Sequence, residues 1–302
     1  MRYIVFFLIL VEFVFGEPIV PLPASVKVDT KKAELGKKLF FDPVLSVDNT
    51  ISCSTCHDLK NGGDDGLKYS FGIEGKEGDI NSPTVYNVVY NFRQFWNGRA
   101  KNLAQQAKGP ILNPVEMGNS FKHLIKTLKE TKYKKEFQNI YVDGITEENI
   151  VDAIAEYEKT LITPNSPFDK YLRGDVSAIT KQQKEGYELF KSKGCIACHH
   201  GINIGGNLYN KFGVMQDAKS KRFGRYEVTK REMDRYYFKV PSLRNIEKTA
   251  PYLHDGRFKT LDEVVKFMAY YQLGHIITQS EVDKIVAFLH SLNGELPEGI
   301  EK

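Results

Sequence analysis

The chain is sparing in cysteine and tryptophan, lacks any long hydrophobic run and has little net charge. Only 4 of its 302 residues are cysteine and one is tryptophan. Its main hydrophobic stretch spans about 13 residues, whereas a membrane-spanning helix needs about 20, which argues against a membrane span. The net charge of +4 is mild and basic residues are interspersed with acidic ones, so the sequence does not suggest nucleic-acid binding. A mildly basic surface would help to dock an acidic partner, although solvated charge is the simpler interpretation.

Residues 1–16 predict a signal peptide. Arg2 supplies the positive start, residues 3–15 are almost wholly apolar, and residues 14–16 have the spacing of a cleavage site. An uncleaved membrane anchor is the alternative, but Glu12 interrupts the apolar stretch. We therefore expect an exported, periplasmic protein whose leader is removed.

The four cysteines form two pairs, and a histidine follows each pair at once. The motif residues are Cys53, Cys56 and His57 in the first half of the chain, and Cys195, Cys198 and His199 in the second half. This is the pattern of covalent haem attachment, in which two thiols bind the porphyrin and the histidine binds the iron. Two disulfides or a four-thiolate zinc site are the alternatives, but neither accounts for the histidines. Because bacterial thioether attachment takes place outside the cytoplasm, two c-type haems agree with an export signal.

The two halves of the chain repeat one another. Each half has a proline followed by the same residue types at the same offsets; the matched residues are Pro83, Asn87, Gly98, Arg99, Lys101 and Leu103 against Pro241, Asn245, Gly256, Arg257, Lys259 and Leu261. Trp96 corresponds to His254, where the residue types differ. The simplest explanation is the duplication of a one-haem cytochrome unit.

The apolar periodicity predicts a mainly helical, all-α fold with long loops. Residues at helical spacing follow Thr146 as a capping residue, and Thr180 with Gln183 forms a capping box before the second haem motif. Further helical faces are expected over 261–268 and 282–289, whereas alternating strand patterns are scarce.

Two domains of ordinary size fit the length of the chain. Residues 163–167 (TPNSP) break the helix between the halves, because proline removes a backbone donor. We place the boundary near 165–178, with cytochrome c-like domains at 17–165 and 166–302. The Gly-rich and polar stretches 58–82 and 201–239 are long loops, which we expect to wrap the haem edges.

Each haem also has a sixth coordination position to account for. Met268 is the best candidate ligand for the C-terminal haem, because thioether sulfur is a soft ligand that raises the reduction potential. Spacing alone also fits a core methionine on an amphipathic helix.

Longer motifs surround the two haem sites. These are residues 95–99 (FWNGR), 105–110 (QQAKGP), 113–117 (NPVEM) and 250–256 (APYLHDG). With the haem motifs, they resemble in type and order the signature segments of bacterial di-haem cytochrome c peroxidases, and the resemblance runs from about residue 30 to 295. It implies that hydrogen peroxide is reduced with electrons from a small periplasmic redox protein, a cytochrome c or a cupredoxin. Members of this family also resemble one another as homodimers.

The resemblance assigns roles around the N-terminal haem. His57 matches the proximal ligand of the low-potential haem where peroxide reacts, Glu116 the distal acid and base, and Gln106 its hydrogen-bonding neighbour. Trp96 matches the tryptophan between the haems, although a lone tryptophan is more often core packing. A buried carboxylate suits peroxide cleavage, since it can accept a proton from one oxygen and return it to the other.

The resemblance also assigns roles to the second half. His199 and Met268 match the ligands of the high-potential, electron-transfer haem. Asn81, with the backbone carbonyls of Thr249 and Pro251, matches the ligands of a calcium ion at the domain junction. An oxygen-only set of this kind suits a hard cation.

One departure from the family concerns the loop after the first haem motif. Many members have a histidine there that caps the oxidised low-potential iron, and the matching position in this chain is Ile73. Isoleucine cannot bind iron, so activation by prior reduction is in doubt.

Two other functions stay open on the sequence. One is a plain electron carrier, in which Glu116 is only a buried carboxylate. The other is an oxidase that modifies a partner protein, but the relatives that form tryptophylquinone have tyrosine where this chain has Met268.

Overall fold

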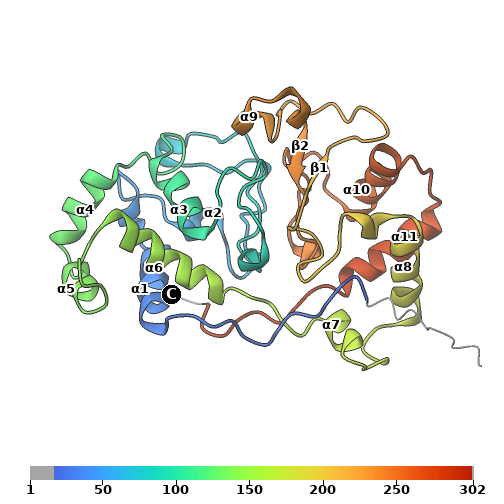
Figure 1. Cartoon of the computed structure of the whole chain (residues 1–302), viewed down its shortest axis with the longest axis horizontal. Helices are drawn as coiled ribbons and strands as arrows, with labels where there is room; N and C mark the ends of the chain where they lie inside the picture. Colours follow the sequence, from blue (N-terminus) through green and yellow to red (C-terminus); the bar gives the residue numbers. More distant parts are fainter. Residues whose placement is uncertain (1–16, 301–302) are drawn as a thin grey trace, which may run out of the picture.

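A computed structural model describes residues 17–300 as two helical lobes lying side by side (Figure 1). The helices are α1 (Thr30–Phe41), α2 (Cys53–Cys56), α3 (Leu103–Leu112), α4 (Phe121–Lys129), α5 (Tyr133–Gln138), α6 (Glu147–Thr160), α7 (Pro167–Leu172), α8 (Lys181–Ser192), α9 (Tyr226–Thr229), α10 (Leu261–Phe267) and α11 (Gln279–His290). A small antiparallel pair, β1 (Tyr209–Lys211) and β2 (Tyr237–Lys239), is the one sheet in these residues. The mainly helical fold expected from the sequence is confirmed.

The capping residues begin the helices where the sequence predicts. The Thr146 hydroxyl accepts a hydrogen bond from the Asn149 amide at 3.1 Å and starts α6. Thr180 and Gln183 bond reciprocally at the start of α8. The helix expected over 261–268 ends one residue early, because Met268 begins a wider π-helical turn, Met268–Gln272.

Each lobe is built on one close pair of helices. In the N-terminal lobe, a side chain at Gly36 on α1 would meet the Ala153 carbonyl of α6 at 1.8 Å. In the C-terminal lobe, a side chain at Gly186 on α8 would meet the Lys284 carbonyl of α11 at 1.9 Å. Glycine is therefore required at both crossings, and the two lobes pack their helix pairs in the same way.

The repeated segments follow the same backbone path in both lobes. Asn87 and Asn245 both have left-handed backbone angles, with φ of 61° and 59°. Both side-chain amides donate to the hydroxyl of Thr163 at 2.8 Å, so the two halves meet at one residue. This shared geometry is what a duplicated unit predicts.

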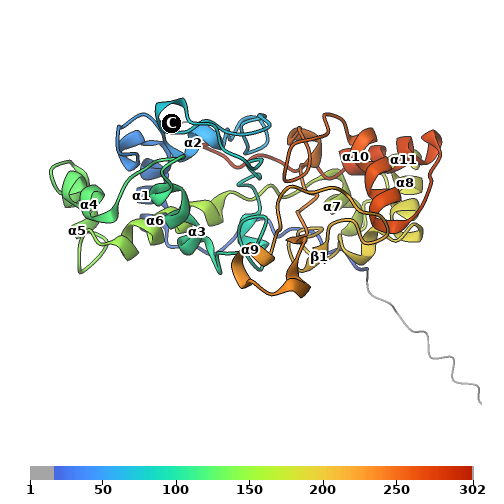
Figure 2. The same ribbon diagram turned by 90° about the horizontal axis from the view of Figure 1, so that it is seen from above.

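The ends of the chain cross between the lobes. Ile19 is packed in the core of the C-terminal lobe, and the Leu22 amide donates to Asp169 of α7 at 3.1 Å. At the other end, Ile300 packs against the core of the N-terminal lobe. Figure 1 shows both crossing segments below the lobes, and Figure 2 shows the elongated molecule from above. A division of the sequence at a single point does not describe these ends.

The predicted signal peptide, 1–16, lies outside the described residues. Within 17–300, every helix is too short or too polar to cross a membrane.

Candidate functional site: two cavities around the cysteine motifs

Each cysteine motif lines its own cavity. The N-terminal cavity, of about 570 Å³, is bordered by Cys53, Cys56 and His57. The C-terminal cavity, of about 230 Å³, is bordered by Cys195, Cys198 and His199. Both walls are mainly apolar, which is the environment that binds a porphyrin.

The histidine of each motif is held in the tautomer that binds iron. The His57 Nδ1 lies 3.0 Å from the Gly63 carbonyl, and the His199 Nδ1 lies 3.4 Å from the Ile204 carbonyl. Because a carbonyl only accepts, Nδ1 carries the hydrogen and Nε2 is left as the ligand atom. Burial lowers the pKa of His57, and it lowers the pKa of His199 to about 4. Both imidazoles are therefore neutral, as a metal ligand must be.

The arrangement of the thiols fits haem attachment better than the alternatives. All four cysteines are free of disulfides. The two pairs border different cavities, so four thiolates do not meet at one zinc ion. Cys53 and Cys56 lie on the single turn of α2, with His57 next in the chain, so the three side chains of this motif border one cavity.

A carboxylate borders the N-terminal cavity from the segment after α3. Glu116 Oε1 accepts a hydrogen bond from the Asn113 side chain at 2.6 Å. Burial raises the pKa of Glu116, while the hydrogen bond from Asn113 and the charge of Arg99 oppose that rise. Gln106 and Arg99 border the same cavity. The structure thus brings Glu116 and Gln106 together with His57, as the sequence predicts for a site of proton transfer.

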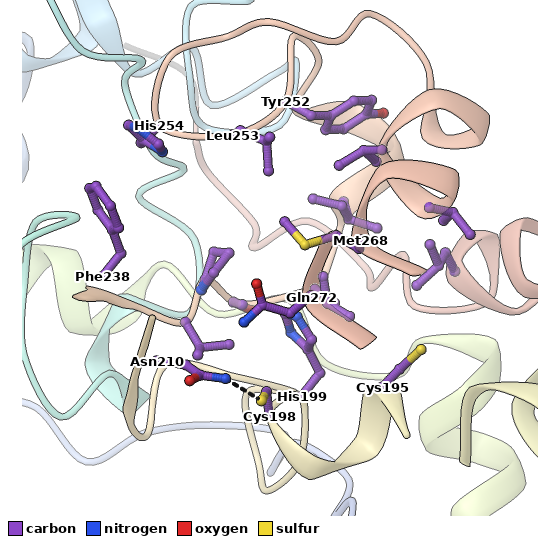
Figure 3. Close-up of a pocket in the computed structure, with 18 of the residues that line it drawn as sticks. Cys195, Cys198, His199, Asn210, Phe238, Tyr252, Leu253, His254, Met268 and Gln272 are labelled. Atoms are coloured by element: carbon purple, nitrogen blue, oxygen red, sulfur yellow. Dashed lines mark hydrogen bonds between the residues drawn. The ribbon is translucent and has the colours of Figure 1, made fainter. Parts of the chain in front are cut away.

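Met268 borders the C-terminal cavity. Figure 3 shows its sulfur and the His199 ring projecting into the same space from different elements. The π-helical turn that begins at Met268 fits this position, since such wide turns are frequent at functional sites.

Trp96 borders both cavities. Its indole nitrogen donates to the Asn81 carbonyl at 2.9 Å, and its ring centroid lies 6.1 Å from that of His254. The two residues that differ in the repeat therefore face each other between the lobes. His254 in turn stacks on Phe238 at 4.3 Å between ring centroids.

The proposed calcium ligands border one of the two cavities. Asn81, Thr249 and Pro251 all border the C-terminal cavity. The Asn81 side-chain nitrogen donates to the Leu67 carbonyl at 2.9 Å, which leaves its side-chain oxygen available for a cation. This donor chemistry fits a hard ion.

Sequence reasoning missed several residues at the cavity walls. Arg222 comes from the C-terminal half but borders the N-terminal cavity, where it binds Asp79 at 2.5 Å and Glu227 at 2.9 Å. Glu158 and Lys239 are both buried at cavity walls. The sequence could have indicated the burial of Glu158, because this residue stands four positions after Ile154 and so falls on the apolar side of α6. No sequence pattern indicates the position of Arg222, because a long loop brings this residue to the N-terminal cavity.

Ile73 does not line either cavity. Its amide donates to the Glu116 carbonyl at 2.9 Å, and its side chain packs on Gly118. The neighbouring residues Ser70, Phe71 and Gly72 border the N-terminal cavity instead.

Two family models match the chain in succession. The model of di-haem cytochrome c peroxidases matches residues 30–177, and the model of cytochrome c matches residues 183–293.

Several known proteins are similar over nearly the whole chain. Cytochrome c peroxidase of Escherichia coli is 51% identical over 286 residues, which cover 92% of this chain but 62% of that protein. Cytochrome c551 peroxidase of Nitrosomonas europaea is 46% identical over 287 residues, covering 94% of this chain and 86% of that protein. A crystal structure of a MauG-like protein associated with microbial copper homeostasis has the same fold, with a TM-score of 0.80 at 24% identity and coverage of 92% and 93%.

Proposed function

The chain belongs to the family of bacterial di-haem cytochrome c peroxidases, and we propose that it reduces hydrogen peroxide to water with electrons from a small redox protein. The observation that carries this proposal is the N-terminal cavity. It combines a complete haem attachment motif with a buried carboxylate, Glu116, whose pKa is raised. A plain electron carrier, in which both haem irons are six-coordinate, does not require a buried carboxylate beside the haem.

The haems would be held by Cys53, Cys56 and His57 in one cavity and by Cys195, Cys198 and His199 in the other, and they would supply redox chemistry at the iron. The carboxylate of Glu116 accepts a proton from one peroxide oxygen and returns it to the other, so that the leaving oxygen departs as water. Asn113 holds this carboxylate in place through its 2.6 Å hydrogen bond. Two electrons and two protons complete the conversion of each peroxide into two waters.

Trp96 and Met268 support the supply of electrons. Trp96 gives an aromatic contact between the two cavities, and Met268 offers the C-terminal site a thioether ligand that favours the reduced state. The electron-transfer haem would therefore belong to the C-terminal half and the peroxidatic haem to the N-terminal half.

We propose that the electron donor docks beside Met268. Exposed apolar residues gather there: Val214, Met215, Tyr270 and Ile276, with Met215 and Ile276 55% and 90% exposed. The Met215 amide donates to the Tyr271 carbonyl at 3.0 Å, which ties this surface to the turn that carries Met268. An apolar surface of this kind suits a small cytochrome c or cupredoxin.

Three further features remain proposals that the family resemblance supports. They are a calcium ion held by Asn81, Thr249 and Pro251, a homodimer, and a periplasmic location after removal of residues 1–16. The free side-chain oxygen of Asn81 supports the first of these.

Replacement of Glu116 tests the proposal. Glu116→Gln keeps the shape of the side chain but cannot shuttle a proton, so we expect peroxide turnover to fall by about 10² to 10⁴-fold. Steady-state oxidation of a reduced cytochrome measures this rate, with haem content checked by the pyridine haemochrome assay. Glu77→Gln is the matched control, because Glu77 is an exposed carboxylate at the rim of the same cavity. Turnover of Glu116→Gln within a factor of two of wild type would remove Glu116 from the mechanism.

A further inference from the structure

Each cavity contains one buried ionisable side chain that the mechanism does not use. Lys239, at the end of β2, borders the C-terminal cavity and is 7% exposed. Glu158, on α6, borders the N-terminal cavity and is 6% exposed. The two side chains carry opposite charges when ionised.

Neither charge has a partner among residues 17–300. Glu158 Oε2 is buried without a hydrogen bond. For Lys239, burial is the one influence on the pKa of the ammonium, and no charged neighbour in this part of the chain contributes. Burial alone raises the pKa of Glu158 to about 8, and burial alone lowers the pKa of Lys239 to about 8. Unpaired buried charges are unfavourable, so both residues work against the stability of the protein alone.

The surroundings of Glu158 leave it facing the cavity. The other charged residues of α6 form ion pairs at the surface: Asp152 with Lys32 of α1, Glu147 with Lys108 of α3, and Glu156 with Lys159. The charge of Glu158 raises the pKa of the Cys53 thiol, and this thiol becomes a thioether on haem attachment. Glu116, Arg99 and His57 border the same cavity, as do the exposed carboxylates of Glu77 and Asp79, and burial raises the pKa of Glu116 as well.

Lys239 is placed between the cavity and the tryptophan contact. Its amide donates to the Trp96 carbonyl at 2.8 Å, and β2 pairs it with Tyr209 of β1. The charged residue on the paired strand, Lys211, does not shift its pKa. Lys239 thus brings a basic side chain to the cavity that the C-terminal motif borders.

We propose that Lys239 and Glu158 separate the reduction potentials of the two haem sites, with a positive charge in the C-terminal cavity and a proton-releasing carboxyl in the N-terminal cavity. A cation beside a haem disfavours the more positive, ferric iron and raises the potential, whereas a carboxylate stabilises ferric iron and lowers it. Each charge widens the gap where it is present: the Lys239 ammonium raises the C-terminal potential below about pH 8, and the Glu158 carboxylate lowers the N-terminal potential above about pH 8. The proposal requires a haem in each cavity, as in the proposed function, but not turnover of peroxide.

The carboxyl of Glu158 makes the reduction potential of the N-terminal haem depend on pH. When that iron is oxidised, an electron leaves the iron for the other haem or for an external acceptor, and the Glu158 proton leaves for solvent. Above the pKa of Glu158 the carboxylate is present and the potential is low, whereas below it the neutral acid leaves the potential high. The potential of the N-terminal haem therefore falls as pH rises through about 8.

Spectroelectrochemical titration of the two-haem protein tests both residues. The signals of the two haems are separated by electron paramagnetic resonance of the oxidised state. Below pH 8, where the ammonium is charged, Lys239→Met should lower the potential of the C-terminal haem and leave the N-terminal haem unchanged. Glu158→Gln should remove the fall of the N-terminal potential near pH 8 and leave the C-terminal haem unchanged.

Matched variants separate charge from packing. Lys239→Arg keeps the charge and should keep the wild-type potential, while Glu158→Asp should keep the pH-dependent fall. Lys230→Met and Glu148→Gln make the same changes at exposed positions and should move neither potential. Glu116→Gln removes the other carboxyl of the cavity whose pKa burial raises, so a fall that survives it but not Glu158→Gln belongs to Glu158. If Glu158→Gln fails to load haem, Glu158→Met gives the same readout.

Two results would overturn the proposal. One is that Lys239→Met and Glu158→Gln match their exposed controls in both potentials. The other is that Lys239→Arg lowers the potential as far as Lys239→Met, which would assign the effect to packing. Because wild-type potentials can be measured without peroxide, loss of the peroxidase hypothesis would leave this test intact.

Discussion

At the scale of single residues, opposing influences set the protonation of Glu116. Burial raises its pKa, and the hydrogen bond from Asn113 together with the positive charge of Arg99 lowers it. Arg99 is held over the ring of Phe95 at 3.3 Å, which fixes its charge near the cavity. The balance keeps a buried carboxyl able to both accept and release a proton.

Removal of Asn113 should shift the pH dependence of catalysis. The base form of Glu116 is present above its pKa, so kcat/KM falls as pH drops through that pKa. Asn113→Ala removes a donor that favours the carboxylate, so the pKa rises and the acid limb moves to higher pH. Profiles of kcat/KM against pH for this variant and for Asn207→Ala, a control in the other half, measure the shift. An acid limb that stays in place or moves to lower pH would contradict this role for Asn113.

Loss of the Met268 sulfur should weaken the C-terminal site as an electron store. Met268→Ala removes the ligand that favours ferrous iron, so we expect a lower reduction potential for that haem. Met215→Ala is the control, because Met215 is a 55% exposed methionine on the same face of the lobe. A redox titration of Met268→Ala that matches the control would mean that another residue is the sixth ligand.

Residues with a fixed sequence spacing were predictable, and residues brought in by loops were not. The cysteine and histidine motifs define their own chemistry, and the equal offsets of the duplication align Trp96 with His254 in the sequence itself. Arg222 reaches the N-terminal cavity through a loop of the other half, and no local pattern reports such a path.

At the scale of elements, the sequence predicts several of the helices. It misses the point at which α10 ends and the π-helical turn begins. Capping side chains and apolar periodicity fix the starts of α6, α8 and α11, because both act within a few residues. The change to a π-helical turn at Met268 depends on contacts across the cavity, so periodicity alone extends α10 by one residue too many.

The loop over the N-terminal cavity is an ordered element despite its irregular sequence. A side chain at Gly72 would meet the Val115 carbonyl at 1.9 Å, which shows how closely the loop approaches the segment of Glu116. Asp79 binds Arg222 of the C-terminal lobe at 2.5 Å. These contacts hold the loop in place with Ile73 facing away from the cavity.

The oxidised enzyme should therefore have an open coordination site at the N-terminal iron. The two lysines of this loop are engaged elsewhere: Lys76 pairs with Glu74 at 2.7 Å, and Lys68 lies over the ring of Tyr69. Electron paramagnetic resonance of the fully oxidised protein should show a substantial high-spin ferric signal. Peroxide should react before any reductant is added. If both haems are low-spin and do not react with peroxide before reduction, the loop supplies a sixth ligand to the N-terminal iron.

At the scale of the whole molecule, duplication explains most of the architecture. Both lobes repeat a glycine-mediated helix crossing, the left-handed asparagine and the helix after the Gly-Arg pair. The sequence predicts this repeat because the spacing between the matched residues is the same in both halves, although other residues have diverged. It does not predict the crossing of the chain ends, which depends on long-range contacts such as the buried pair Arg244 and Asp169, 3.0 Å apart, and the bond from Arg244 to Val20.

The two lobes also have different polar environments despite their common origin. The N-terminal cavity has Glu116, Glu158 and Arg99 at its walls, and the C-terminal cavity has Met268 and Lys239. Divergence of these side chains on one scaffold underlies our proposal that peroxide chemistry belongs to one half and electron storage to the other.

The most direct test of this assignment is steady-state oxidation of a pre-reduced small cytochrome by peroxide, using purified protein of known haem content. We predict two haems per chain that resist acid-acetone extraction, and two donor molecules oxidised for each peroxide consumed. Cys195→Ala with Cys198→Ala should remove one haem and stop the reaction, because the donor then has no entry site. Absence of peroxide-dependent donor oxidation in a protein with both haems, or a single haem per chain, would contradict the account.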